Sequence, residues 1–382
     1  MKFTKTTRTL TALAAIGALG LSACGGDSNG GSTDGDGAAS SGETVTLNAA
    51  TMVQPKTPNA PVENWFYDQL EERSDGRITI DRTEPESICP AQEIAQCIID
   101  GRADVGTSIA DYSPQLFPSL TIVSVPFMVD NSQVLMETLY KVNEENESAK
   151  AKWDEVGLKL VGAWGPGKLI IGTNEKVQNL DDINGMRFRV TGGFLQRAFE
   201  SAGANVVALT AGETYEGIER GIADAVAWTM DGPVDYKMME QLSIWSDPGV
   251  GHYTTFATWM NQDVYNGMPD DLKAVVDEVV ADLNGGEGMK AFNEVTTPQC
   301  DAMLEHGNVD EFTAWEQAEA DQWKEAAQAE LIEQWVADAE ANGLTDAQTY
   351  LDEYMAALEE AAGAEDLVED PVAACIDRFA SR

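Results

Sequence analysis

Few side chains in this sequence could carry covalent or metal chemistry. The chain has only two histidines, His252 and His306, and neither an HExxH nor a CxxC pattern. A zinc site or a nucleophile activated by histidine is therefore not indicated. Asp224 and Asp231 could serve as the paired carboxylates of an extracytoplasmic hydrolase, but no nucleophile or base accompanies them. We expect a protein that catalyses no reaction, needs no cofactor and has no metal ligands.

Arg189 has the side chain and the position expected of a binding residue. It ends a short, buried-looking strand that we expect at 186–190, so its guanidinium either forms a structural ion pair or points at a ligand. A guanidinium offers a planar pair of N–H donors that matches the two oxygens of a carboxylate. Arg187 faces the same side of such a strand, but we do not assign it to the site.

The charge of the chain limits its partners. Lys and Arg number 24 against 65 Asp and Glu, which gives a formal net charge of -41. This charge excludes a nucleic-acid binder and repels anionic lipid headgroups, and at long range it also repels an anionic ligand. Any anion site must therefore be locally basic. We interpret most of the acidic residues as a solvated surface.

The N-terminus has the pattern of an export signal. Basic residues precede an apolar run, 10–21, that is too short to span a membrane. The string Leu-Ser-Ala-Cys-Gly that follows is similar to a lipobox, which makes Cys24 the lipidated first residue of the mature chain. We predict a signal peptide over 1–23 and a flexible Gly- and Ser-rich tether over 24–43. The protein would sit on the outer face of the cell membrane, held only by its lipid.

The remaining cysteines are even in number, which in an exported chain indicates disulfides. Three pairings are possible, and proximity in the sequence favours one between the first two and one between the last two. The first two are eight positions apart, too far for a disulfide within one helix. Pro90 supplies a break between them. The four residues are Cys89, Cys97, Cys300 and Cys375.

Predicted strands and helices alternate along the chain, which indicates the α/β class with a mainly parallel sheet. From about residue 270 onward we expect almost only helix, including 310–341 and 345–362. A stripe of large apolar residues in this third, Trp315, Trp323, Leu331 and Trp335, indicates packing and not ligand contact. Strands are expected at 44–50, 77–82, 104–109, 121–127, 158–164, 169–172, 186–190, 205–208, 223–228 and 252–261.

The segment around Arg189 also resembles a family signature. Residues 180–190, Leu-Asp-Asp-Ile-Asn-Gly-Met-Arg-Phe-Arg-Val, resemble the pattern dl-x-G-x-k-x-R-v of the solute-binding proteins of TRAP transporters, the DctP family. Further segments are similar to the family in the same order and at consistent spacing, so the resemblance covers nearly the whole mature chain. They are Cys97–Asp104, Val125–Phe127, Gly203–Ala204, Glu213–Tyr215, Gly221–Asp224 and Trp259–Lys273.

This resemblance implies a fold and a task. The fold would be α/β and periplasmic-binding-protein-like, with two domains, a cleft between them and a helical C-terminal third that includes a long bracing helix. Domain I would comprise 44–166 and about 255–294, and domain II about 167–254 and 295–382. The protein would capture a small organic anion, close around it and deliver it to a TRAP permease in the membrane. A binding protein that feeds a sensor kinase or another transporter would have the same sequence pattern.

The resemblance also implies site residues. It places Arg189 where the family's arginine clamps the substrate carboxylate, and it puts Lys168 one position from a second expected cation. Trp228 and Trp164 would present apolar faces to the cleft, which favours a ligand with a ring or an aliphatic face over a sugar acid, although both tryptophans fit a core position equally well. Loops after the N-terminal strands would add contacts from Gln54, Ser108 and Tyr112.

Overall fold

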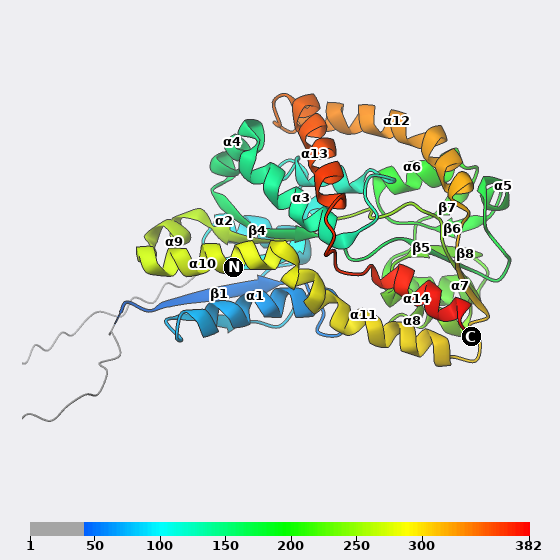
Figure 1. The fold of residues 1–382 in the computed structure, drawn as a ribbon, viewed down its shortest axis with the longest axis horizontal. Helices are drawn as coiled ribbons and strands as arrows, with labels where there is room; N and C mark the ends of the chain where they lie inside the picture. The colour runs from blue at the N-terminus through cyan, green and yellow to red at the C-terminus, as the bar shows by residue number, and fades with distance from the viewer. Residues whose placement is uncertain (1–41) are drawn as a thin grey trace, which may run out of the picture. The chain divides into compact units, whose positions relative to one another are not determined.

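The structure is a computed structural model, and it describes residues 42–382. The predicted signal peptide, Cys24 and the tether up to residue 41 lie outside the described residues. Two β-sheets and the helices around them make up the described part of the chain (Figure 1). None of the helices in this part is long and apolar enough to cross a bilayer.

The first sheet contains five strands in the order β2-β1-β3-β10-β4. Strand β1 (Val45–Thr51) pairs in parallel with β2 (Ile78–Arg82) and β3 (Val105–Ile109), the arrangement expected of strands joined through helices. Strand β10 (Phe256–Asn261) inserts antiparallel between β3 and β4 (Leu158–Trp164). The chain therefore returns to the first sheet after it has built most of the second.

Helices pack around the first sheet, and local residues explain where two of them begin. The side chain of Asn131 accepts hydrogen bonds from the backbone amides of Gln133 and Val134 at 2.9 and 3.0 Å, so it caps α3. Asn146 caps α4 by accepting from Ala149 at 2.9 Å. Such caps satisfy amides that have no partner within the helix. The helices are α1 (Asn59–Arg73), α2 (Ile94–Ile99), α3 (Ser132–Glu145), α4 (Glu147–Val156), α9 (Gln262–Gly267) and α10 (Asp270–Asp282).

The second sheet contains six strands in the order β11-β9-β5-β8-β6-β7. Strand β6 lies between β7 and β8 and is parallel to both, whereas β5 is antiparallel to β8 and β9. In each sheet a single strand, β10 in the first and β5 in the second, runs antiparallel to the others. Both sheets are therefore mainly parallel, as the sequence predicted. The strands are β5 (Ile170–Thr173), β6 (Arg187–Arg189), β7 (Asn205–Val207), β8 (Ala225–Trp228), β9 (Ile244–Asp247) and β11 (Glu311–Ala314).

Short helices connect the strands of the second sheet. A capping box stands at the start of α7: the Glu213 carboxylate accepts from the backbone amide of Thr210 at 3.0 Å and from its hydroxyl at 2.8 Å. Helix α8 begins with Asp231, three positions after Trp228 ends β8. The helices are α5 (Leu180–Ile183), α6 (Gly193–Ser201), α7 (Ala211–Glu219) and α8 (Asp231–Val234).

Four helices of the C-terminal third link the two sheets. Helix α11 contacts α1 beside the first sheet and α8 beside the second, so it braces both. Helix α12 runs from α6 to α13, and α13 packs against α3 (Figure 1). The predicted apolar stripe is buried: Trp323 donates to the Ala198 carbonyl at 3.1 Å and Trp335 to the Thr121 hydroxyl at 3.0 Å. These helices are α11 (Gly288–Glu305), α12 (Gln317–Ala341), α13 (Ala347–Ala362) and α14 (Pro371–Ala380).

Two predicted elements differ in the structure. The apolar run 121–127 is not a strand, since Leu120–Ser124 form a 3₁₀ helix. Its residues are buried on all sides, and periodicity cannot distinguish a buried strand from a buried helical turn. The predicted helix over 310–341 is also wrong in its first part, because β11 precedes α12 and pairs in parallel with β9. Phe312 and Thr313 in β11 are residue types that favour strands.

The structure contains two disulfides, Cys89–Cys97 and Cys300–Cys375. Cys89 precedes Pro90 and lies outside α2, which carries Cys97, so the helix break falls where the spacing requires it. Cys300 and Cys375, whose Cα atoms are 5.6 Å apart, join α11 to α14. The second disulfide therefore fastens the C-terminal helix to the helix that braces both sheets.

Candidate ligand-binding site

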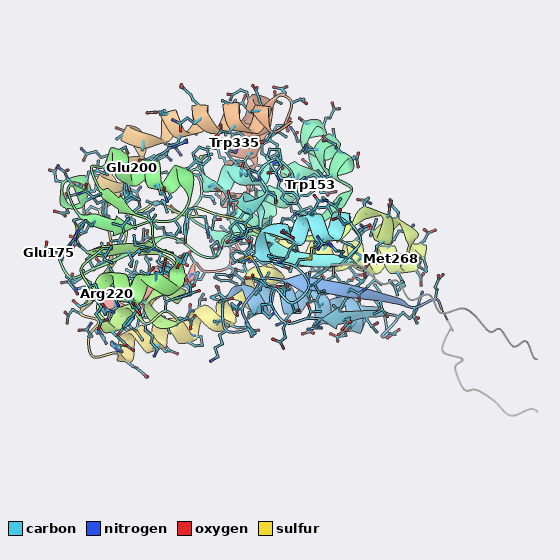
Figure 2. All side chains as sticks on the ribbon, turned by 180° about the vertical axis from the view of Figure 1, so that it is seen from behind. Trp153, Glu175, Glu200, Arg220, Met268 and Trp335 are labelled. Carbon is cyan, nitrogen blue, oxygen red and sulfur yellow. A yellow bond between two sulfur atoms is a disulfide. The ribbon has the colours of Figure 1, made fainter. Side chains whose placement is uncertain are left out.

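A cavity of about 820 Å³ lies among segments that follow strands of both sheets. Such a position, outside the carboxyl ends of strands, is where open α/β sheets bind ligands. Helix α12 closes one side of the cavity with Trp335, which is labelled in Figure 2. The strands of the first sheet and the segments that follow them contribute Gln54, Ile109, Tyr112 and Phe256 to the lining. Those of the second sheet contribute Arg189, Trp228, Asp231 and Tyr236.

Arg189 contributes a buried cation to this cavity. It ends β6, and only 4% of the residue is exposed. Its guanidinium donates weakly to the carbonyls of Leu209 and Ala227, at 3.3 and 3.5 Å, and within residues 42–382 it forms no ion pair. Burial lowers the pKa of Arg189, although Tyr253 and Asp231 nearby act in the opposite direction. An unpaired buried guanidinium is costly, and a bound anion would relieve that cost.

Trp228 holds the guanidinium in place. The Arg189 guanidinium carbon lies 3.8 Å from the centroid of the Trp228 ring, within the range of a cation–π interaction. The ring also contacts Tyr236, and Gly232 packs so closely that an added Cβ would lie 2.6 Å from the indole. Trp228 lines the cavity, but it is only 5% exposed. It therefore orients Arg189 and does not present the wide free face expected from the sequence.

Two other predicted contacts lie on the cavity. Gln54 follows β1 and Tyr112 follows β3, and both line it. Tyr112 is 40% exposed, which is unusual for a large apolar side chain in this structure. Burial of the remainder of its surface raises the pKa of Tyr112. Its exposed part is therefore available to contact a ligand in the cavity.

Lys168, Trp164 and Ser108 do not line the cavity. The Lys168 ammonium lies 2.7 Å from an Asp247 oxygen and 3.7 Å from Asp130, so its charge is already paired. Burial disfavours this ammonium, but the charges of Asp247 and Asp130 outweigh burial and raise the pKa of Lys168. Arg189 is consequently the buried cation of the site. The sequence predicted that Lys168 would face the ligand, but in the structure it pairs with Asp247 and Asp130.

Trp164 and Ser108 support the cavity from behind. Trp164 is fully buried, donates to the Asn59 side chain at 2.9 Å and stacks near Phe256. Asn59 and Phe256 themselves line the cavity, so Trp164 occupies the core position that the sequence left open. The Ser108 hydroxyl donates to the Ala91 carbonyl at 2.7 Å and is buried. The two side chains lie on opposite faces of the first sheet, because Trp164 pairs with Phe256 and Ser108 with Ala257, the next residue of β10.

Several side chains of the cavity were not predicted. Tyr236, Tyr253 and Phe256 add aromatic surface, and Asp111 and Asp231 add carboxylates. Tyr253 and Phe256 belong to the crossing that follows β9, so the rule that binding residues follow strands could have identified them. Asp224, the suggested catalytic partner of Asp231, instead pairs with Arg187 at the exposed end of β6. The structure therefore does not bring the two carboxylates together, as a hydrolase would need.

Comparison with known proteins places this architecture in a family. The family of bacterial extracellular solute-binding proteins, family 7 (DctP), matches residues 49–338. The chain belongs to this family. The resemblance seen in the sequence is thereby confirmed, and because the DctP family consists of solute-binding proteins, the chain is not an enzyme.

Curated DctP relatives are distant. The ectoine-binding periplasmic protein TeaA of Halomonas elongata is 26% identical over 176 residues, which is 44% of this chain and 49% of the relative. The 2,3-diketo-L-gulonate-binding periplasmic protein YiaO of Escherichia coli is 25% identical over 162 residues, 42% of this chain and 49% of the relative. The chain thus matches about half the length of these relatives.

Solved structures of DctP proteins share the fold over most of the chain. A TRAP periplasmic solute-binding protein from Desulfovibrio salexigens has a TM-score of 0.75 at 21% identity, covering 84% of this chain and 98% of the other. One from Bordetella bronchiseptica with bound mandelate has a TM-score of 0.66 at 22% identity, with 83% and 99% covered. One from Rhodoferax ferrireducens with benzoate has a TM-score of 0.70 at 20% identity, with 84% and 99% covered.

Proposed function

We propose that this DctP protein captures a small organic carboxylate in the cavity and delivers it to the membrane permease of a TRAP transporter. The observation that carries the proposal is Arg189, a buried guanidinium without a carboxylate partner among the described residues, held against Trp228 in an aromatic-lined cavity. A ligand carboxylate would supply the missing counter-charge through two parallel hydrogen bonds. The rings around it would contact the apolar part of the ligand.

Ligands named for relatives agree with this class. Those of TeaA and YiaO are ectoine and 2,3-diketo-L-gulonate, and two solved relatives hold mandelate and benzoate. All four molecules carry a carboxylate, and two carry an aromatic ring. Sequence identity to these proteins is low, so we propose only the class of ligand. The thermal-shift screen described next is designed to find the particular acid.

A thermal-shift screen over organic acids tests this function. A ligand that binds only the native state stabilises it by about 2.7 kcal/mol at a concentration one hundred times its Kd, so one or more monocarboxylates should raise the melting temperature by several degrees. Neutral amides of the same acids serve as the control and should have no effect. A set of chemically diverse acids that leaves the melting temperature unchanged would remove the basis for the proposal.

We also propose that the two sheets belong to two domains that close around the ligand, with boundaries near 166, 255 and 295. The crossings after β4 and β9 would bend, as hinges do in other two-domain binding proteins. Small-angle scattering should show a smaller radius of gyration once the acid from the screen is added at saturation. The same radius with and without that acid would argue for a rigid cavity.

Attachment to the membrane through a lipid on Cys24 completes the proposal, and it rests on the lipobox-like string before that residue. In fractionated cells the wild-type protein should sediment with membranes, and the Cys24→Ser variant should not. A wild-type protein found wholly in the soluble fraction would show that no lipid anchor is made.

A further inference from the structure

Asp231 brings a carboxylate into the same cavity as Arg189. It is the first residue of α8, three positions after Trp228, and it lines the cavity. The Thr229 hydroxyl donates to one of its oxygens, and no Lys, Arg or His among residues 42–382 forms an ion pair with it. Asp231 is therefore a second charge in the site without a partner of opposite sign in direct contact.

Asp111, the other buried carboxylate of the cavity wall, shows what a structural role looks like. Both of its oxygens are used: one accepts from Ser124, and the other accepts from the Thr254 hydroxyl at 2.9 Å and the Thr255 amide at 3.3 Å. These bonds tie the end of β3 to two neighbouring segments. A carboxylate has about four acceptor sites. Burial raises the pKa of Asp231, and hydrogen bonds from the Thr229 hydroxyl and the Trp228 side chain act in the opposite direction. Neither of these donors is a cation, so the charge of Asp231 has no counter-charge among the groups that bond to it.

The surroundings place Asp231 and Arg189 within electrostatic reach of each other. The charge of Asp231 raises the pKa of Arg189, after the opposite effect of burial. Tyr236 and Tyr253 line the same cavity as both groups, and the Tyr236 ring packs against the Trp228 ring on which Arg189 stacks. Burial and then Asp231 raise the pKa of each tyrosine, while Arg189 lowers it. The two opposite charges therefore share one aromatic chamber.

Charge balance decides what this chamber can hold. A carboxylate bound to Arg189 uses its positive charge and leaves the charge of Asp231 unpaired in a site of low polarity, which is unfavourable. A second ligand carboxylate would be repelled. A cationic nitrogen on the ligand would pair with Asp231 and could also lie against the tyrosine rings. Such a ligand is neutral overall, so the strongly acidic protein would not repel it at long range.

We propose that Asp231 selects zwitterionic ligands, with the carboxylate bound by Arg189 and a cationic nitrogen bound by Asp231. This inference rests on the proposed function and narrows the carboxylate to one that also carries a positive charge. Asp231 would then be a specificity-determining residue, because it favours the zwitterion and disfavours the analogous carboxylate that lacks a cationic nitrogen.

Matched ligand pairs test the proposal by calorimetry. Each pair compares a zwitterion with a carboxylate of the same shape: pipecolate with cyclohexanecarboxylate, and meta- and para-aminomethylbenzoate with meta- and para-ethylbenzoate. The three pairs differ in the distance between carboxylate and nitrogen, which covers a range of spacings. Para-carboxymethylbenzoate adds a second negative charge. The wild-type protein should bind at least one zwitterion about tenfold or more tightly than its partner, and it should bind the dianion most weakly.

Two variants of α8 and its end separate a specific contact from a general change of charge. Asp231→Asn keeps an acceptor for Thr229 but removes the charge, so it should lose the preference for the zwitterion and bind the simple carboxylate, which lacks the cationic nitrogen, at least as well as wild type does. Asp235→Asn removes the same charge one helical turn later. The Asp235 side chain accepts from Gln299 at 2.8 Å and lies off the cavity lining, so this control should keep the preference. Thermal melts establish that both variants are folded.

The outcomes also distinguish this inference from the proposed function. Simple carboxylates without a cationic nitrogen that bind as well as their zwitterionic partners, and that need Arg189, would overturn the role of Asp231 and leave the function standing. The same conclusion follows if Asp231→Asn retains the zwitterion preference, or if none of the panel binds while other acids succeed in the thermal-shift screen. Failure of every acid in that screen would reject the function itself.

Discussion

Replacing Arg189 by alanine should weaken ligand binding by roughly 30-fold to several thousand-fold, the range expected when one partner of a buried charge pair is removed at a cost of about 2 to 5 kcal/mol. The ligand carboxylate would lose its hydration on entering the cavity and find no replacement for it. Arg189→Lys should not restore wild-type affinity, since an ammonium is a point charge without the planar pair of donors and without the stacking on Trp228. Calorimetry with the acid found in the screen measures both effects.

Arg187 offers a matched control on the same strand. Its guanidinium pairs with Asp224 at the exposed end of β6, and Arg187 does not line the cavity. Arg187→Ala should therefore leave affinity within about threefold of wild type, as expected for an exposed ion pair. If the Arg189→Ala variant is folded and binds as tightly as the Arg187→Ala variant, Arg189 is not the anchor.

Replacing Lys168 by methionine should destabilise the fold by about 3 to 5 kcal/mol, the cost of breaking a buried ion pair from one side. Methionine keeps much of the packing of the lysine stem, so the loss would come mainly from Asp247, whose side chain is only 7% exposed and which would lose its counter-charge. Urea unfolding measures the change. The double variant Lys168→Met with Asp247→Asn should recover part of the loss, because the carboxylate in closest contact with the Lys168 ammonium then carries no charge.

The loss should also depend on pH. Burial raises the pKa of Asp370 to about 6 and also raises that of Asp130, while the Lys168 charge lowers both. Without the ammonium, both carboxyls should bind protons more tightly in the folded state than in the unfolded one. Stability of Lys168→Met should then rise relative to wild type as the pH falls from 7 to 5. A deficit that does not change over this range would show that lost packing and not lost charge is responsible.

An exposed lysine provides the comparison. Lys176 pairs with Glu311 at 3.1 Å, but the two side chains are 54% and 42% exposed. Such pairs contribute between about 0 and 1 kcal/mol, so Lys176→Met should change stability little. Equal effects at Lys176 and Lys168 would contradict the importance given to burial.

The chemistry of the site could be predicted from the sequence where a single residue carried it. Arg189 ends a strand, and its guanidinium offers a planar pair of N–H donors that matches a carboxylate. Both properties can be recognised from the residues immediately around it in the sequence. The prediction for Lys168 failed to find its partner because Asp247, Asp130 and Asp370 come from three distant segments, and no local pattern indicates that they meet around one ammonium. A lysine in the same local sequence could lie without a carboxylate partner in another fold, so the local sequence does not determine the partner.

Orientation of side chains was the other limit. Trp164 and Ser108 lie at the predicted strand ends, but a shift of one position in a strand moves a side chain to the other face, and here both face the core. Trp228 reaches the cavity, yet its free surface depends on Gly232 and Tyr236, which pack against it after a turn. The sequence suggested Asp231 only as the partner of Asp224 in a hydrolase. The three-dimensional arrangement showed that its neighbour in the site is Arg189 and not Asp224.

The order of the strands governs when this chain can acquire its structure during synthesis. Strand β10 fills the gap between β3 and β4, so the first sheet stays split until the chain has been made as far as Asn261. Helix α13, which covers α3, and helix α14, which packs near β11, are made later still. Pairings between such distant segments fold slowly and leave strand edges open in the meantime. We therefore expect the first sheet and the helices that cover it to complete their packing only late in synthesis.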